Sequence, residues 1–457
     1  MSRFDLLVRG GTVVTPGAAE TSDIGVLDGV VAAVGPDLEG GARETVDAAG
    51  LHVFPGVVDA HVHCNDPGRA DWEGLVHGTR ALAAGGATTF VDMPLNASPP
   101  TVDGASFDLK VAAAEGAALV DFALWGGLVP GPLDRLDELA ERGVVGFKAF
   151  MCPTGIDDFQ MADDETLLAG MERAARLGLP VAVHAENAEL TTRLAAKALA
   201  EGRRTLRDYL ASRPVVAELE AIERAVDMAE SAGCSLHVVH VSTGAGVALV
   251  TAARSRGVDV TCETCPHYLA LDEEAAIEVG LAAKCSPPLR PRQDVEDLWR
   301  AVLGGEVDLV ASDHSPGLPE RKQGDDAFAA WGGIAGCQTL LRVLLTEGPP
   351  RGLSLEAVAE LSAAAPARRF RLAGKGSLEP GADADLTLVD VGIEATLTRE
   401  ELLSRHRLNP LVGRPLRGRV ERTILRGSTV CLGGDMVASP GGRLVRLYPG
   451  RSTEARS

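Results

Sequence analysis

The stretch VVDAHVH, residues 57–63, is the first of eight short apolar runs that recur along the chain and decide its fold. Between the runs lie longer stretches rich in Ala, Leu and Glu with helical spacing, such as ETLLAGMERAARLG from residue 165. Repeated strand–helix units predict a parallel sheet, and eight of them predict an α/β fold with a closed (β/α)8, TIM-like barrel. The other runs are TTFVDMP from 88, FALWGGL from 122, VVGFKAF from 144, PVAVHAE from 180, SLHVVHV from 235, DVTCETC from 259 and DLVASDH from 308.

Both ends of the chain contain short strand-like runs with glycine turns and without helical spacing between them. FDLLVRGGTVV and IGVLDGVVAAVG lie near the start, and ADADLTLVDV and RTILRGSTVCL lie near the finish. Such runs are typical of antiparallel strands. We therefore expect one small β-sandwich domain built jointly from residues 1–52 and 377–457, with the barrel, residues 53–376, inserted between them.

Composition and charge narrow the class of protein. The chain has 457 residues, of which 46% are hydrophobic, and is long enough for one large core and a smaller satellite domain. Its formal net charge of −20 would repel nucleic acid and anionic lipid, so neither nucleic acid nor a membrane is expected as a partner. The start, MSRFDLLVRGG, has no apolar signal core, which favours a cytoplasmic location.

The eight cysteines are scattered along the chain, several of them inside apolar runs. This distribution is more typical of reduced thiols in a core than of a disulfide framework. Cys262 and Cys265 form a single CxxC motif, and without a second pair we expect them to be buried structural residues rather than zinc ligands.

Polar side chains stand at the ends of several of the barrel runs. His61 and His63 are at i and i+2 in the first run, so their imidazoles point to the same face. Catalytic groups of such barrels gather at the carboxyl ends of the strands, where further polar residues should meet this pair. A single histidine there is more often a hydrogen-bonded core residue, but the whole set predicts a metal centre. Its other members are Lys148 in the fourth run, His184 in the fifth, His240 in the sixth and Asp313 in the eighth.

Lys148 is the most informative of these residues, because VVGFKAF places an amine in an otherwise apolar run, where burial disfavours the charged form. One explanation is an ion pair with a buried carboxylate. The other is reaction of the neutral amine with carbon dioxide to give a carbamate, whose two oxygens could each hold one divalent metal ion. The second explanation also accounts for the number of imidazoles around the lysine.

Imidazole, carboxylate and carbamate are nitrogen and oxygen ligands that suit zinc, with manganese, iron and cobalt as alternatives. Two divalent ions would make water a nucleophile near neutral pH and polarise an amide carbonyl, so no Ser or Cys nucleophile is needed. Asp313 would take the proton of the attacking water as general base and deliver it to the departing nitrogen as general acid. These residues predict a metal-dependent hydrolase.

At this point the motifs resemble a known family, the amidohydrolase superfamily, in the branch that contains dihydroorotases, hydantoinases and allantoinases. The resemblance covers nearly the whole chain, and it implies hydrolysis of a cyclic amide and a homo-oligomer, typically a tetramer. It also implies that His61, His63, Lys148, His184, His240 and Asp313 are the metal ligands, with Lys148 carboxylated. The motifs, in order, are DAHVHCNDPGR, GGATTFVDMPLN, GGLVP, GFKAFM, VHAEN, HVVHVS, ETCPHYL, AKCSPPLR, SDHSP and WGGIAG.

Two departures from the relatives' patterns concern the substrate rather than the metal centre. Similar dihydroorotases carry an arginine two residues after the second histidine, to bind a carboxylate, whereas this chain has Asn65. Hydantoinases tend to place a tyrosine five residues after the lysine, whereas this chain has Pro153. Within the branch the chain is therefore most similar to the allantoinases, which hydrolyse allantoin to allantoate in purine breakdown.

Several further residues are candidates for contacts with the substrate. Asn96 ends the MPLN motif, Gly333 lies in the WGGIAG run, and Ser286 in CSPPLR could equally be a turn residue before two prolines. His267 and His314 could contact the substrate or support the metal ligands. We interpret His52, His77, His237 and His406 as structural.

Three alternatives to an allantoinase remain from the sequence. The nearest is a hydantoinase or dihydropyrimidinase of broad specificity, and a dihydroorotase is disfavoured by Asn65. A different class of protein is a non-catalytic scaffold relative that has lost its metal ligands. The filled ligand positions argue against the scaffold.

Overall fold

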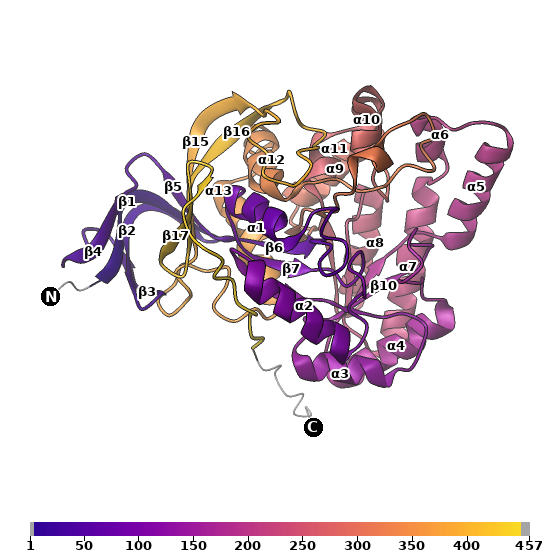
Figure 1. The fold of residues 1–457 in the computed structure, drawn as a ribbon, viewed down its shortest axis with the longest axis horizontal. Coiled ribbons are helices and arrows are strands. Elements are labelled where there is room, and N and C mark those ends of the chain that lie inside the picture. The colour runs from indigo at the N-terminus through magenta and orange to yellow at the C-terminus, as the bar shows by residue number, and fades with distance from the viewer. Residues whose placement is uncertain (1–3, 449–457) are drawn as a thin grey trace.

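The computed structural model describes residues 4–448. A sheet surrounded by helices lies beside a smaller β-rich unit that contains strands from both ends of the chain (Figure 1). Short strands alternate with helices from residue 57 onward. These strands are β6 (Val57–Val62), β7 (Ala87–Asp92), β8 (Asp121–Leu124), β9 (Gly126–Gly127), β10 (Phe147–Phe150), β11 (Val181–His184), β12 (Leu236–Val238), β13 (Val260–Thr264) and β14 (Leu309–Val310).

The strands are all parallel and close into a barrel. β6, β7 and β8 form one parallel sheet, and β9 to β14 form another. The two sheets meet where β8 leads into β9 and where Val62 pairs with His314, just beyond β14. Each of the eight apolar runs contains a strand, and the predicted (β/α)8 barrel is confirmed.

Helices follow the barrel strands and cover them on the outside. Their ends obey local rules: the Asp163 carboxylate accepts a hydrogen bond from the Thr166 backbone N–H at the start of α4, and Gly178, with φ 66°, ends that helix in the left-handed conformation. The helices are α1 (Leu75–Ala84), α2 (Gly104–Ala117), α3 (Asp134–Arg142), α4 (Asp164–Leu177), α5 (Ala188–Ala200), α6 (Leu206–Ala211), α7 (Val215–Ala232), α8 (Gly244–Ser255), α9 (Pro266–Ala270), α10 (Glu273–Val279), α11 (Arg292–Leu303), α12 (Leu340–Glu347), α13 (Leu355–Ala359) and α14 (Ala365–Arg369).

The barrel strands are buried on both faces, and successive side chains enter different hydrophobic clusters. In β11, Ala182 belongs to a cluster that also contains Val91 of β7 and Leu309 of β14, which fills the interior of the barrel. Its neighbour Val183 instead packs in the cluster shared with the surrounding helices. Because apolar side chains fill both faces along the strands, polar residues are placed at the carboxyl ends of the strands.

The strands near the two ends of the chain combine in one nine-stranded sheet. Its order is β18-β17-β16-β15-β5-β1-β2-β3, with β4 paired to β1, and the antiparallel pair of β5 and β15 joins the two ends. The strands are β1 (Phe4–Thr15), β2 (Ala18–Leu27), β3 (Val30–Gly35), β4 (Ala42–Asp47), β5 (His52–Pro55), β15 (Leu386–Thr396), β16 (Pro415–Leu425), β17 (Ser428–Leu432) and β18 (Asp435–Met436).

The sheet has a hydrophobic cluster of its own, which joins Leu6 and Ile24 to Leu386 and Ile424. The sheet thus contains strands from both ends of the chain, as expected for the predicted sandwich domain. The boundaries at 52/53 and 376/377 stay predictions, and β5 crosses the first of them. Residues 1–3 and 449–457 of the proposed domain lie outside the described residues.

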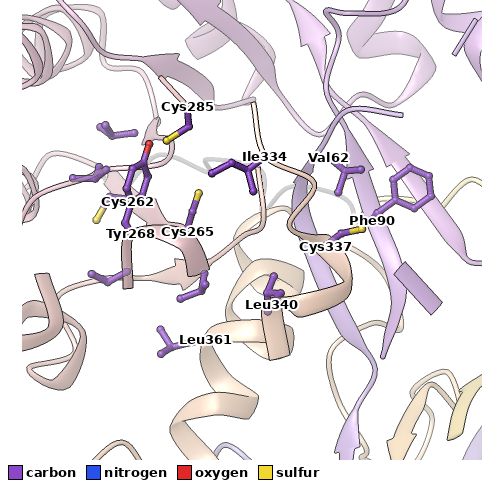
Figure 2. Packing of buried hydrophobic residues seen from close by; sticks show 14 of the residues in the cluster. Val62, Phe90, Cys262, Cys265, Tyr268, Cys285, Ile334, Cys337, Leu340 and Leu361 are labelled. Carbon is purple, nitrogen blue, oxygen red and sulfur yellow. The ribbon is translucent and has the colours of Figure 1, made fainter. Parts of the chain in front are cut away.

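Cys262 and Cys265, the CxxC pair, lie in the hydrophobic core beside Tyr268 and Cys285 (Figure 2). Burial raises the pKa of the Cys262 thiol and of the Cys265 thiol above the usual range. Both residues therefore have the environment of structural core thiols. Within residues 4–448, no helix combines the length and apolarity needed to span a membrane.

A buried ion cluster joins the barrel to the terminal sheet. The Lys375 amine lies 2.6 Å from Asp121 at the start of β8, 2.7 Å from Asp383 and 2.9 Å from Asp385 just before β15. Burial alone would lower the pKa of Lys375, but the three carboxylates raise it above its usual value. The amine therefore stays charged and offsets three negative charges in a nearly dry environment.

Lys375→Met should destabilise the protein by about 3–5 kcal/mol, because it removes the buried cation that Asp121, Asp383 and Asp385 share and leaves Arg426, which pairs with Asp121, as the remaining cation of the cluster. The measurement is the midpoint of chemical unfolding. Arg43→Met is a matched control, since Arg43 pairs with Asp5 through a side chain that is 78% exposed, and it should leave the midpoint unchanged. Equal midpoints for both variants would contradict a stabilising role for the cluster.

Candidate metal centre and active site

The six candidate metal ligands lie at the carboxyl ends of five barrel strands. His61 is in β6, Lys148 in β10, and His184 is the last residue of β11. The other three lie within three residues of the end of a strand: His63 after β6, His240 after β12 and Asp313 after β14. Each of the six is at most 7% exposed. Such a buried set of polar groups needs partners to offset the loss of water.

The ligand candidates converge on one point. Asp313 Oδ1 is 3.3 Å from His61 Nε2 and 3.5 Å from His63 Nε2. The ring centroids of His61 and His240 are 5.4 Å apart, and those of His240 and His184 are 4.7 Å apart. Ligand atoms of His61, His63 and Asp313 all lie within 4.8 Å of one another, close enough to bind one ion together.

Two of the candidate ligands have a left-handed backbone, which is uncommon for residues other than glycine. His240 has φ 41° and Asp313 has φ 43°. Left-handed backbone at a residue other than glycine costs about 1–3 kcal/mol and is found preferentially at functional sites. Here it turns each side chain toward the other ligands at the point where the strand ends.

Lys148 is fully buried, and its amine has no hydrogen-bond partner among residues 4–448. It lies 4.6 Å above the ring of Phe150, and within those residues no ion pair reaches it. Burial lowers the pKa of Lys148 to about 7. Of the two explanations offered by the sequence, the ion pair is therefore absent, and a neutral amine open to modification fits the surroundings.

Glu263 orients the first histidine. Its carboxylate can only accept, so His61 Nδ1 donates to Oε1 over 2.5 Å and His237 Nε2 donates to Oε2 over 3.1 Å. Burial alone would raise the pKa of Glu263, but the two imidazoles hold it well below its usual range. The bond on Nδ1 leaves His61 Nε2 free to face Asp313, which is the usual arrangement of a metal-bound histidine.

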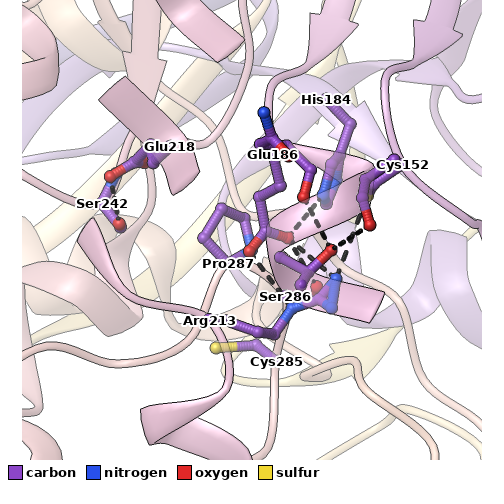
Figure 3. A network of polar contacts seen from close by, with 12 residues as sticks. Cys152, His184, Glu186, Arg213, Glu218, Ser242, Cys285, Ser286 and Pro287 are labelled. Atoms are coloured by element: carbon purple, nitrogen blue, oxygen red, sulfur yellow. Dashed lines mark hydrogen bonds and ion pairs between the residues drawn. The ribbon is translucent and has the colours of Figure 1, made fainter. Parts of the chain in front are cut away.

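Glu186 plays the same part for His184. The His184 Nε2–H donates to its carboxylate over 2.8 Å, and Arg213 and the Ser286 hydroxyl bind the same carboxylate at 3.1 and 2.9 Å (Figure 3). Burial by itself would raise the pKa of Glu186, but Arg213 and His184 hold it at about 2. The negative charge of Glu186 therefore offsets most of the positive charge that Arg213 would otherwise present to the cavity.

Sequence reasoning missed both carboxylates. Glu263 lies inside DVTCETC, of which only the two cysteines were interpreted. Glu186 ends PVAVHAE, two residues after the candidate ligand His184. A charged residue inside an apolar strand was the available signal, the same one that drew attention to Lys148. His237, interpreted as structural, takes part through its bond to Glu263.

A cavity opens directly beside the metal-ligand candidates. It is lined by His61, His63, His184, His240 and Asp313, together with Leu95, Asn96, Phe150, Pro153, Thr154, Arg213, Ser286, Ser315, Trp331 and Gly332. Two predicted substrate contacts, Asn96 and Ser286, are therefore part of its wall. Gly333 follows the lining residue Gly332, and its backbone N–H donates to the Lys284 carbonyl.

The other two histidine candidates lie away from the wall of the cavity. His267 is buried behind Asp313, neither ring nitrogen has a partner among residues 4–448, and burial lowers its pKa to about 4. His314 Nε2 lies 3.4 Å from Glu73 Oε1 in a fully buried position.

Comparison with known proteins gives a consistent picture. Residues 52–430 match the model of the amidohydrolase family. Allantoinase of Rubrobacter xylanophilus is 64% identical over 98% of each chain, and allantoinase of Solibacter usitatus is 54% identical over 99% of each. Among solved structures, L-hydantoinase (dihydropyrimidinase) of Arthrobacter aurescens is 35% identical, with a TM-score of 0.94 over 97% of this chain and 100% of that one. Dihydropyrimidinase of Brevibacillus agri is 32% identical, with a TM-score of 0.89 over 96% and 98%.

Glu263→Gln should weaken binding of a divalent metal ion by about 10–100-fold, because the amide no longer accepts from both imidazoles and His61 loses its fixed orientation. Calorimetric titration of chelator-stripped protein with zinc measures the effect. Glu44→Gln on the surface, where Glu44 pairs with Arg422, is the control and should bind as the wild type does. Unchanged affinity in the Glu263 variant would remove that residue from the metal centre.

Proposed function

The chain belongs to the amidohydrolase family, and we propose that it is an allantoinase, which opens the hydantoin ring of allantoin by hydrolysing a cyclic amide to allantoate. The observation that carries this proposal is sequence identity of 46–64% over nearly the whole length to several curated allantoinases. The positions of the predicted ligands support it, since five of the six line one cavity and ligand atoms of His61, His63 and Asp313 lie within 4.8 Å of one another.

The metal centre we propose holds two divalent ions, zinc first, with manganese, iron or cobalt as alternatives. Four imidazoles, a carboxylate and an unpaired buried amine are a donor set that fits such ions. We propose that Lys148 is present as its carbamate, formed from the neutral amine and carbon dioxide, because its pKa near 7 makes the neutral form abundant. When bound, the ions supply electrophilic activation of the amide carbonyl and make water nucleophilic at neutral pH.

Asp313 is the residue that moves the proton. Burial alone would raise the pKa of Asp313, but His61 and His63 lower it, so the carboxylate is ionised and ready to accept. Water adds to the ring carbonyl carbon and gives up a proton to Asp313. The carbon–nitrogen bond then breaks, and Asp313 returns the proton to the departing ring nitrogen. No Ser or Cys nucleophile is needed for this sequence.

The wall of the cavity favours a ring without a carboxylate. Asn65, which stands where similar dihydroorotases have an arginine, is buried, and its amide donates to the Pro316 carbonyl. Pro153, which stands where hydantoinases tend to have a tyrosine, lines the cavity and offers no hydroxyl. The nearest alternative, a hydantoinase or dihydropyrimidinase, is kept because several solved structures with this fold bear those names.

We extend the proposal to the setting of the enzyme. A small molecule is its partner, and we propose a homotetramer in the cytoplasm that acts in allantoin degradation. The assembly can be measured by light scattering on the purified protein.

Wild-type enzyme loaded with zinc or manganese should have its highest kcat/KM on allantoin when racemic allantoin, hydantoin, dihydrouracil and dihydroorotate are compared side by side. Treatment with a chelator should abolish the activity, because carbonyl activation is lost. Preference for hydantoin or dihydrouracil would move the assignment to the neighbouring branch. Absence of activity on every ring, together with absence of bound metal, would favour the non-catalytic scaffold.

Lys148→Ala should lose bound metal and activity together, because the proposed bridge between the ions is gone. A short-chain carboxylic acid added with metal should restore part of both, since its two oxygens can replace those of the carbamate. Metal analysis and turnover of the same sample test this. Full activity of the variant without added acid would show that Lys148 holds no metal.

A further inference from the structure

Outside the candidate metal ligands, one buried hydrogen-bonding group in the cavity wall has no partner among residues 4–448. Asn96 is 3% exposed and lines the cavity, and its Oδ1 accepts no hydrogen bond from residues 4–448. A buried amide oxygen without a donor costs about 1–3 kcal/mol, so a ligand that supplies an N–H there is favoured.

The other polar side chains of the wall, apart from the candidate ligands, are already engaged. The Thr154 hydroxyl donates to the Phe159 carbonyl, the Ser286 hydroxyl to Glu186, and the Ser315 hydroxyl to the Asp313 carbonyl. Arg213 is paired with Glu186. Among the described side chains of the wall, Asn96 is therefore the best placed to form a hydrogen bond with a neutral polar group of the substrate.

Trp331 provides a flat apolar surface in the same wall. Its indole N–H donates to the Ser315 carbonyl over 2.9 Å, so the ring offers the cavity its apolar surface rather than a donor. Trp72 packs edge-on against it at 4.8 Å, and the Arg321 guanidinium lies 5.1 Å from its centre. These contacts hold the indole in place.

The two residues belong to one side of the cavity. Arg69 donates to the backbone carbonyl of Asn96 and lies 5.7 Å above Trp72, which in turn packs against Trp331. Loops that follow β6, β7 and β14 are thereby joined around the same part of the wall.

We infer that Asn96 and Trp331 form a subsite for the ureido substituent of the ring. A primary amide and a ureido group each present an N–H beside a C=O, so they can form two parallel hydrogen bonds, and the planar ureido group can lie against the indole face. This inference rests on the proposed function, because it assumes a ring that carries a ureido group and whose reacting amide lies at Asp313.

A purely structural role for Asn96 is the competing explanation. Its φ of 70° lies in the left-handed region, which asparagine tolerates better than most residues. Asn96→Gly separates the two roles, since glycine adopts this conformation without strain but has no amide. Asn96→Asp keeps the size and the tolerance for positive φ but cannot donate.

The test compares metal-loaded wild type, Asn96→Gly and Asn96→Asp on allantoin and on hydantoin, which lacks the ureido group. We expect the ratio of kcat/KM for allantoin to that for hydantoin to fall by about 10–100-fold in both variants, the range set by a lost buried hydrogen bond. Inhibition constants replace kcat/KM where hydantoin turns over too slowly. Trp331→Leu should lower the same ratio more than Trp331→Phe, which keeps an aromatic face.

Equal losses of kcat/KM on allantoin and hydantoin, or an unchanged ratio of the two in Asn96→Gly, would overturn the proposed subsite. Asn96 would then have only a structural role in the loop. Metal content and thermal midpoint, measured on each variant, establish that the centre and the fold are intact. Wild-type turnover of allantoin tests the proposed function by itself, so the failure of either idea is recognisable separately.

Discussion

The parallel pairing of the first barrel strand with the last is the contact on which the active site depends. His63 N–H donates to the His314 carbonyl over 2.7 Å, and the Asp59 carboxylate accepts from Ser312 N–H over 3.0 Å. This seam closes the barrel and places His61 of β6 and His63, just after it, within 3.5 Å of Asp313. A shift of one residue in the pairing would turn these side chains to the other face, so barrel closure and metal-centre geometry are one constraint.

Around that seam the protein buries many polar groups, and only some of them form hydrogen bonds with one another. Glu263 and Glu186 accept from ring nitrogens of His61 and His184 and so decide which nitrogen of each ring faces the centre. The Lys148 amine and His240 Nδ1 have no hydrogen-bond partner among residues 4–448. Buried polar groups without partners are costly, and the metal centre proposed at this end of the barrel would supply the cations that such a set favours.

The proposed substrate subsite and the proposed metal centre lie on different elements. The candidate ligands lie in or shortly after barrel strands, whereas Asn96 and Trp331 belong to the loops that follow β7 and β14. Arg69 and Trp72 link these loops across the cavity. If the proposed subsite is correct, a change in these loops would alter which ring is accepted without disturbing the proposed metal centre.

Sequence alone determined the strand–helix alternation, the barrel and the six candidate ligands. These depend on local periodicity and on residues at the ends of strands, both of which are visible along the chain. Tertiary structure decided what each ligand contacts. Glu263 meets His61 across 202 residues and Ser286 meets Glu186 across 100, and no local pattern encodes such pairs. The place of Trp331 in the cavity wall has the same origin, because three loops must pack together before an indole faces a substrate.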